Sequence, residues 1–440
     1  MNNRRLAQKL SWIIAGVMAL LPFHALITTW LGSNFGHLDG WRIWKELIIF
    51  GLAFPSGYLA VQDKKIRTWL KKDWLPRLII VYVLLHFALG IWALKTGRVN
   101  NSALIYSWLI NLRFLGFFTI VLVVSVKSSF LKKYWQKILL LPAGVVIIFG
   151  LLQRFVLPYD FLRHFGYGPK TIPAYQTVDN KLSYQRVQST LRGANPLGSY
   201  LVLIIPALFF GLHKKPAFRY LALFGSLLVL FFSYSRSSWL GLLIAAGLFM
   251  YWSISKTRLK QVAIIVGVIF VLITAGTLSF RNNRTIQNTF FHTDNQSTSI
   301  DSSNEDRVAA LETSSREVFR EPLGRGPGTA GPASIRNNQP ARIAENYYLQ
   351  IGQEVGLVGL TLFLGINFLI AKTLWKLRDD NLAKLLLATL AGITFINLLS
   401  HAWTDDTLSL LWWDLAGIAM AASVKNSDIL NEKRKHVQTS

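Results

Sequence analysis

Long uninterrupted apolar runs constrain the fold of this chain more than any other feature of its sequence. A helix that crosses a bilayer needs roughly 20 mostly apolar residues, and runs near that length recur throughout the 440 residues. Some runs are shorter, so totals of eleven or thirteen helices stay open. The twelve runs predicted to span a membrane are 11–31, 43–61, 75–94, 104–126, 138–157, 197–212, 218–233, 238–253, 261–280, 355–371, 385–400 and 407–424. We therefore expect an all-α polytopic membrane protein.

Composition excludes several other classes of protein. Charged residues make up 16% of the chain, whereas soluble domains carry about 25%. A hydrophobic share of 52% is equally wrong for a disordered chain. The net charge of +25 resides between the apolar runs, so we expect a bilayer and no nucleic-acid partner. The absence of cysteine excludes disulfides and thiolate metal sites.

Lysine alternates between loops, and this alternation predicts the orientation of the chain. Every second loop is basic, and basic loops stay in the cytoplasm. Both termini are then cytoplasmic, and the first run, which has a basic start and no convincing cleavage site, is expected to be retained as a helix. We expect an inner-membrane protein with five helices in 1–157, an extracytoplasmic loop 158–196, four helices in 197–280, a large extracytoplasmic loop 281–354, three helices in 355–424 and a cytoplasmic tail 425–440.

The large loop 281–354 is predicted to contain a helix and the active-site segment. Loops longer than about 12–15 residues tend to be functional or disordered. A capping-box pattern at Ser303 predicts the start of an amphipathic helix. Its apolar face is expected to combine Val308, Leu311, Val318 and Phe319.

Arginine outnumbers lysine in the loops predicted to lie outside. A guanidinium binds phosphate through a planar fork, whereas an ammonium is a hydrated point charge. Arg236 is the sharpest case, because serines surround it between two apolar runs and an arginine at such a depth requires a partner. These residues indicate a phosphate or diphosphate ligand; contact with anionic lipid, or solvation, is the alternative.

Other polar residues carry weaker signals. Glu345 and Asn346 are expected to open the helix after the large loop. A carboxylate in that first turn acts either as a helix-dipole partner or as a general base. Asp405 and Asp406 offer oxygen ligands, but no third ligand is evident, so no metal or cofactor is expected. Within or beside the apolar runs, further polar candidates are His24, His86, Arg113, Arg154 and Asp414.

Three sequence blocks together resemble the O-antigen ligase and O-antigen polymerase superfamily. The first is 186–201, the second is 233–240, and the third consists of 304–307, 323–328 and 345–360. Singly each block is weak, but their order and spacing are specific. One position departs from the family pattern. Family members usually read His-Asn-x-x-Leu where this chain has residues 345–349, and Glu345 stands here in place of the histidine. Glutamate has an ordinary pKa of about 4.3 against about 6.5 for histidine, so it is the weaker base.

The resemblance implies transfer of a glycan from a polyprenyl (undecaprenyl) diphosphate carrier to an acceptor hydroxyl outside the cytoplasmic membrane, without a metal, as in lipopolysaccharide assembly. The acceptor would be a glycan, a lipid or a protein. By this resemblance Arg236 and Arg307 would bind the diphosphate and Glu345 would be the base. The residues expected to bind substrate are Arg186, Arg192, Asn195, Ser235, Arg325, Asn346 and Tyr347.

Three other functions compete with ligation. A polymerase of the same superfamily differs only in its acceptor. A solute or anion transporter would need a polar path across the membrane, but the arginines collect on one side. The third alternative is a catalytically inactive scaffold, because Glu345 replaces the histidine that the family uses as its base.

Overall fold

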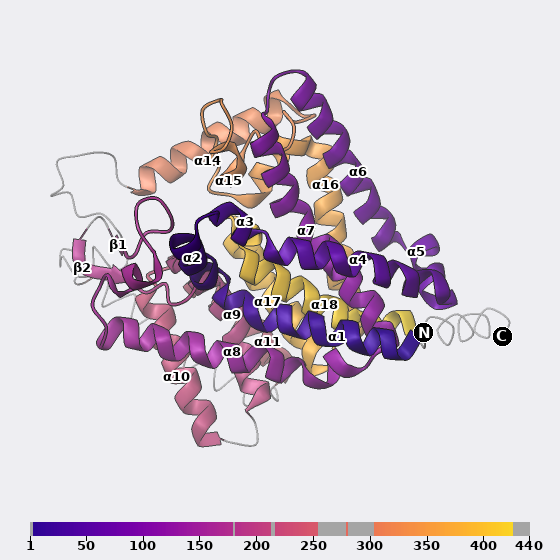
Figure 1. The fold of residues 1–440 in the computed structure, drawn as a ribbon, viewed down its shortest axis with the longest axis horizontal. Coiled ribbons are helices and arrows are strands. Elements are labelled where there is room, and N and C mark those ends of the chain that lie inside the picture. Colours follow the sequence, from indigo (N-terminus) through magenta and orange to yellow (C-terminus); the bar gives the residue numbers. More distant parts are fainter. Residues whose placement is uncertain (1–2, 179–180, 213–215, 254–278, 280–302, 426–440) are drawn as a thin grey trace.

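The computed structural model describes residues 3–178, 181–212, 216–253, 279 and 303–425, with side chains from 308 onward in the last range. It is almost entirely helical (Figure 1). The long helices are α1 (Asn3–Leu20), α2 (His24–Phe35), α4 (Trp44–Gln62), α6 (Trp74–Lys95), α7 (Asn101–Lys127), α8 (Phe130–Phe155), α9 (Ala194–Gly211), α10 (Pro216–Phe232), α11 (Arg236–Ser253), α14 (Ser303–Arg320), α16 (Tyr347–Lys376), α17 (Asn381–Asn397) and α18 (Asp406–Lys425). The short helices are α3 (Leu38–Arg42), α5 (Lys64–Lys72), α15 (Gly331–Ser334), η1 (Leu21–Phe23), η2 (Phe161–Phe165) and η4 (Ala402–Thr404).

Eleven of the twelve predicted spans fall on these helices, and the run 261–280, apart from residue 279, lies outside the described residues. Within the described part, seven helical segments are long and apolar enough to cross a membrane. An all-α membrane protein is therefore supported, but the count of twelve spans is not confirmed. The predicted loop 158–196 also contains a small antiparallel hairpin of β1 (Gln176–Val178) and β2 (Lys181–Arg186).

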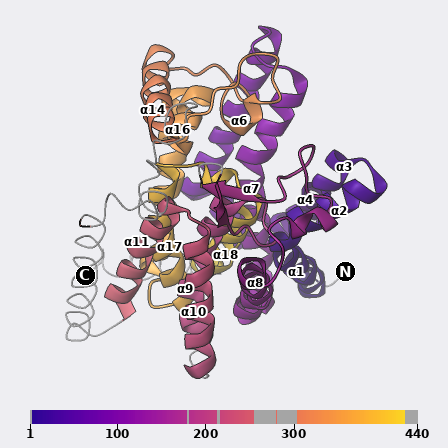
Figure 2. The ribbon, with the colours of Figure 1, turned by 90° about the vertical axis from the view of Figure 1, so that its left-hand side faces the viewer.

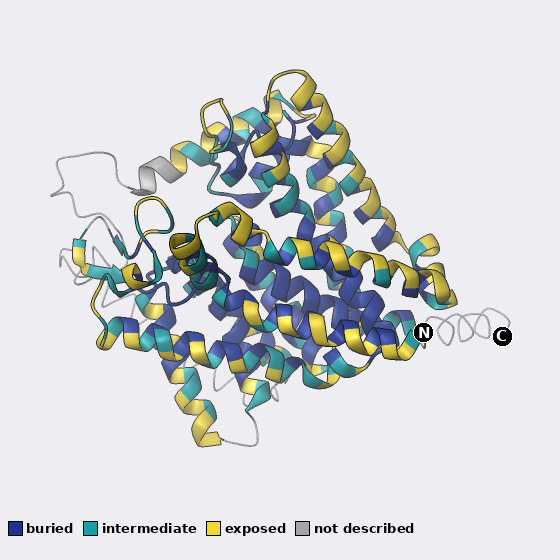
Figure 3. Cartoon of the chain, viewed as in Figure 1, coloured by how far each residue is buried: buried dark blue, intermediate teal, exposed yellow. Residues whose placement is uncertain are grey.

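The outward faces of the bundle are apolar. Figure 3 shows exposed residues along the outer sides of α1, α4, α6 and α10. Trp12, Phe50, Leu84 and Leu221 are each more than 60% exposed on these helices. Apolar surface on this scale marks contact with another apolar phase, which for helices of this length is a bilayer.

Contacts join the described parts of three predicted basic segments at what is here called the basic end. Lys65 Nζ donates to the carbonyl oxygen of Lys425 at 2.7 Å, and Lys127 forms an ion pair with Asp63. At the other end, here called the loop end, lie α2, α3, η2, the hairpin and η4 (Figures 1 and 2).

We expect reporter tags at positions 68, 130 and 440 to be cytoplasmic and tags at 175 and 300 to be outside, because basic loops remain in the cytoplasm. Paired alkaline phosphatase and fluorescent-protein fusions in living cells measure this. A cytoplasmic signal from position 300 would place the large loop 281–354 on the wrong face for a carrier whose glycan is presented outside.

Helix α18 forms the centre of the bundle and packs along α7. Trp412 and Trp413 are fully buried, and the ring of Trp413 lies 4.9 Å from that of Phe114 on α7. A Cβ at Gly417 would lie 2.8 Å from the carbonyl oxygen of Phe118, so this glycine permits the close approach of the two helices. The buried helix α18 therefore holds its first residues in a fixed position at the loop end.

Glu354 attaches the glycine-rich turn 323–328 to the bundle. This buried carboxylate accepts hydrogen bonds from Ser107 Oγ (3.0 Å), Asn111 Nδ2 (2.8 Å) and the backbone N–H of Gly328 (2.7 Å). At Gly356 the backbone turns to φ 70°, and α16 kinks. Glu354 and Gly356, which lie in the family-like stretch 345–360, therefore have a structural role in this protein.

Helix α14 exists as predicted, but its predicted apolar face is wrong. Val308 and Phe319 are 64% and 76% exposed, whereas Val318 is buried against Gly352 of α16. Glu317 explains the orientation, because it accepts hydrogen bonds from Arg342 and from Gln353 at 2.6 Å each. These polar contacts select the buried face, which hydrophobic spacing alone did not reveal.

Candidate functional site

A cavity at the loop end, here called the arginine pocket, contains three of the predicted residues. It encloses about 750 Å³. Arg163, Arg186 and Arg192 are among its lining residues, and none of the described residues that line it carries a carboxylate. Asn195, at the start of α9, also lines it. Three guanidiniums facing one cavity form an environment suited to phosphate groups.

Arg186 is held in place by two hydrogen bonds at the end of β2. Its Nε donates to the carbonyl oxygen of Ser233 at 2.9 Å, and its Nη2 donates to Asn195 Oδ1 at 2.5 Å. The first contact joins the arginine pocket to the turn that precedes α11. The second orients the amide of Asn195. The structure therefore brings together residues from separate sequence blocks.

Arg236 begins α11 immediately after a tight turn. Tyr234 adopts φ 51°, and the hydroxyls of Ser235 and Ser238 lie 2.9 Å apart. Both serines are buried, and a Cβ at Gly198 of α9 would lie 2.7 Å from Ser238 Oγ. Ser235 thus shapes the turn that positions Arg236, which is itself partly buried.

Arg192 connects the arginine pocket with a second cavity. Its Nε lies 3.2 Å from Asp405 Oδ2. Burial alone would lower the pKa of Arg192, but the carboxylates of Asp405 and Asp406 outweigh burial and raise it. Burial, aided by the charge of Arg192, lowers the pKa of the neighbouring His401 to about 4. A fixed cation therefore faces both cavities beside a neutral imidazole.

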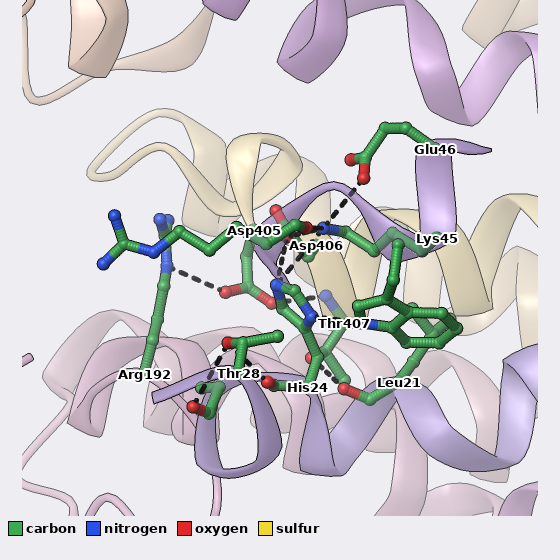
Figure 4. A network of polar contacts seen from close by, with 12 residues as sticks. Leu21, His24, Thr28, Lys45, Glu46, Arg192, Asp405, Asp406 and Thr407 are labelled. Carbon is green, nitrogen blue, oxygen red and sulfur yellow. Dashed lines mark hydrogen bonds and ion pairs between the residues drawn. The ribbon is translucent and has the colours of Figure 1, made fainter. Parts of the chain in front are cut away.

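The second cavity, here called the central polar pocket, has a volume of about 420 Å³. It lies among α2, α4, α7 and the start of α18, and Figure 4 shows the network of polar contacts at its base. Its charged lining residues are Asp39, Arg42, Lys45, Glu46, Arg113, Arg192, Arg336, Asp405 and Asp406.

His24 is neutral in this network, as its hydrogen bonds show. Trp44 Nε1–H can only donate, and it donates to His24 Nδ1 at 2.9 Å. Nδ1 therefore carries the lone pair, and the ring proton lies on Nε2. That Nε2 donates to Asp406 Oδ2 at 3.1 Å.

Lys45 and Arg113 supply the charges that balance two carboxylates. Lys45 is only 2% exposed, and its Nζ lies 2.8 Å from Asp406 Oδ2 and 3.2 Å from Glu46 Oε2. Arg113 contacts the same two carboxylates. Two cations against two anions give a neutral cluster, which permits charged groups to remain buried.

We expect Asp406→Asn to destabilise the protein by about 3–5 kcal/mol, because removing one partner of a buried ion pair leaves its other members uncompensated. Asp39→Asn is the control, because it removes a carboxylate that also contacts an arginine but is 73% exposed. Exposed ion pairs contribute about 1 kcal/mol or less to stability, so this variant is expected to lose less stability. Thermal unfolding in detergent compares the two variants. Equal shifts in unfolding temperature would show that the network contributes no special stability.

Asn346, and not Glu345, caps α16. Asn346 Oδ1 accepts from the backbone N–H groups of Tyr348 and Leu349, and its Nδ2 donates to the carbonyl oxygen of Leu398. Glu345 precedes the cap with φ 50° and is partly buried, so the expected position in the first helical turn is wrong. Tyr347 is fully buried and supports the helix start. Glu345 is thus a carboxylate outside the helix at a rigid junction.

Two predicted arginines lie in the large loop. Arg325 forms an ion pair with Glu321, which lies four residues earlier. That contact raises the pKa of Arg325 and lowers the pKa of Glu321. The backbone of Arg307 lies in α14, and its side chain lies outside the described part. The structure therefore does not place Arg307 in either cavity.

The adjacent aspartates Asp405 and Asp406 make hydrogen bonds and ion pairs within the protein. Asp405 accepts from the backbone N–H groups of Thr407 and Leu408, and Asp406 joins the buried network. Among the described residues, no group of three or more histidines or acidic residues could hold a metal ion.

Sequence reasoning missed Lys45 and Glu46 and treated His24, Arg113 and Asp406 as separate weak candidates. Lys45 and Glu46 lie at the start of an apolar run, where charged residues are ordinary. One signal in the sequence could have indicated the network. Residues of opposite charge stand at the ends of several predicted spans, and charged residues within a membrane generally pair with one another.

A comparison with known protein families matches part of the chain. Residues 221–364 match the family described as O-antigen ligase, which confirms the predicted resemblance over this segment. Arg236, Arg307, Arg325 and the 345–347 segment lie inside it, whereas the buried network lies outside. No curated protein matches the chain. The match supports an enzyme of the O-antigen ligase or polymerase type, acting on glycans at a membrane.

Proposed function

We propose that this protein transfers a glycan from a polyprenyl diphosphate carrier to an acceptor hydroxyl at the loop end of the bundle, outside the cytoplasmic membrane. The observation that carries the proposal is the arginine pocket, where Arg163, Arg186 and Arg192 line one cavity and no carboxylate is among the lining residues that the structure describes. A diphosphate leaving group develops negative charge as its bond to the sugar breaks. Preorganised guanidiniums stabilise that charge in the transition state.

Arg236 and Arg307 bind the diphosphate in this proposal, and Arg186 and Arg192 complete the clamp. The hydrogen bond from Arg186 to the carbonyl oxygen of Ser233 supports the arrangement, because Ser233 lies three residues before Arg236 in the same turn. The reaction needs no metal in this scheme, since the leaving group is already a stable anion.

Glu345 accepts the proton of the acceptor hydroxyl in this proposal. Its position just before the N-cap of α16, a junction tied to the end of α17 by Asn346, supports the assignment. A base must be oriented before it can act in a transition state. Asn346 and Tyr347 provide that orientation, and Asn195 and Arg325 contact the glycan.

The glycans of a strain that lacks the gene test the proposal. Lipid-linked polymer is expected to accumulate if the protein is a ligase, and single lipid-linked repeat units if it is a polymerase. An unchanged glycan profile would contradict the proposed transfer reaction. Complementation with an Arg186→Ala chain is expected to leave the deletion phenotype in place.

A further inference from the structure

A cavity at the basic end, here called the lysine pocket, is separate from the two cavities already described. It encloses about 530 Å³, and none of its described lining residues lines either of the other two. Figure 1 shows the start of α1 and helix α5 at this end of the bundle. The start of α1, the junction of α4 and α5, and the ends of α7 and α18 all contribute to the pocket. Its charged lining residues in the described part are Arg4, Asp63, Lys65, Lys127 and Lys425.

Four cations oppose one carboxylate among these described lining residues, and that carboxylate is already engaged. Asp63 Oδ1 accepts from the backbone N–H groups of Lys65 and Ile66 at 2.7 and 3.0 Å and so caps α5. Asp63 Oδ2 forms an ion pair with Lys127, whose side chain is 23% exposed. The lining therefore carries an excess of positive charge, which a bound anion would offset.

The kind of cation in the lysine pocket distinguishes it from the arginine pocket. Three of its four cations are lysines, and Lys65 Nζ donates to the carbonyl oxygen of Lys425 at 2.7 Å. A lysine binds phosphate as a compact point charge, without the planar fork of a guanidinium. The lysine pocket therefore suits a phosphate group that is held by charge from several directions.

The surroundings of the lysine pocket place it at the surface of a bilayer. Val61, in the last turn of α4 directly before the pocket, is exposed and apolar. On α5, Ile66 and Trp69 are buried whereas Lys71 and Lys72 are exposed, an amphipathic pattern typical of helices at a membrane surface. A molecule with a phosphate in the pocket can therefore lay apolar chains against α4.

The tail 426–440 follows Lys425 directly but does not supply the opposing charge. It contains two acidic residues, Asp428 and Glu432, against three basic residues at 433–435. The cytoplasmic leaflet, in contrast, has a negative surface potential because it contains anionic lipids. The lysine content of the loops predicts that the basic end faces that leaflet.

We propose that the lysine pocket binds the phosphate group of an anionic glycerophospholipid from the cytoplasmic leaflet, with the acyl chains against the exposed apolar side of α4. The bound lipid joins the start of α1 to the ends of α7 and α18. This binding does not depend on the proposed transfer reaction.

The first experiment titrates fluorescent short-chain phosphatidylglycerol into the purified full chain in a nonionic detergent, where no charged bilayer surrounds the protein. Each basic residue beside an anionic lipid contributes about 1 kcal/mol, which is about a fivefold change in affinity. Arg4→Gln and Lys425→Gln are therefore each expected to weaken binding about fivefold, and about 25-fold together. Both changes keep the backbone carbonyl of Lys425 that Lys65 contacts.

Lys71→Gln combined with Lys72→Gln is the matched control. It removes the same charge from exposed positions on α5 that do not line the lysine pocket, and it is expected to weaken binding less than about threefold. Equal weakening by the two double variants would overturn the inference, because positive charge at this end would then act without the pocket. Unfolding temperatures without lipid verify that each variant is folded.

Competition on the wild-type chain tests the identity of the ligand. Unlabelled phosphatidylglycerol is expected to displace the probe, and inorganic phosphate or phosphatidylcholine to displace it about tenfold less well. Equal displacement by inorganic phosphate would show a site for free phosphate, and equal displacement by phosphatidylcholine would show that charge is not recognised; either result overturns the inference. Full-length Asp428→Asn with Glu432→Gln is expected to bind normally. About tenfold tighter binding by that variant would show that the tail occupies the pocket in place of a lipid.

Discussion

Arg236→Lys is expected to reduce transfer about 10- to 100-fold, although the positive charge is kept. A guanidinium binds a diphosphate through two parallel N–H donors, and a lysine provides only a point charge. Losing one hydrogen bond to a charged group costs about 1.5–3 kcal/mol, and each 1.36 kcal/mol is about a tenfold change in rate. Turnover of a lipid-linked donor by the purified variant measures the effect.

Arg316→Lys provides the matched control for this substitution. Arg316 lies on α14 with a side chain that is 68% exposed and is paired only with Glu312 among the contacts described. The same chemical change there is expected to leave turnover unaltered. If Arg236→Lys and Arg316→Lys both transfer at the wild-type rate, Arg236 acts in the fold or as a simple charge.

Apolar spacing predicted most helices because a bilayer requires long apolar runs regardless of how those runs pack. It failed where polar residues are buried inside a helix. The predicted apolar run begins at 355, whereas helix α16 begins at Tyr347, close to the helix start expected at Glu345. Apolar spacing does not cover the first turns of α16, because they contain the buried polar residues Gln350, Gln353 and Glu354. Their burial depends on partners such as Ser107 and Asn111 of α7, which local sequence does not reveal.

The candidate site was only partly predictable for a similar reason. Arg186, Arg192 and Asn195 are close together in the chain, and the short segment that carries them lines one pocket. The buried network instead takes Lys45, Arg113 and Asp406 from three helices far apart in sequence. A single sequence shows which charges need partners, but the partners become visible only when the helices are packed.

The structure changes the interpretation of Glu345 more than that of any other candidate residue. The backbone N–H groups at the start of α16 are capped by Asn346, so Glu345 is not required for the cap. A residue with φ 50° lies in a region where backbone strain often accompanies function. The carboxylate can therefore be altered without removing the cap, which makes substitution at this position a direct test of chemistry.

Glu345→Gln is expected to reduce transfer by about 10²- to 10⁴-fold, the range of general acid–base catalysis, with the folded yield unchanged. The substitution keeps the size of the side chain and removes its proton acceptor. Glu345→His is expected to keep or raise activity near neutral pH, because histidine is the stronger base. Glu312→Gln is the matched control, because Glu312 is a carboxylate on α14 that is 60% exposed. Wild-type turnover in Glu345→Gln would remove the base assignment and leave Arg236 and Arg307 as the core of the proposed site.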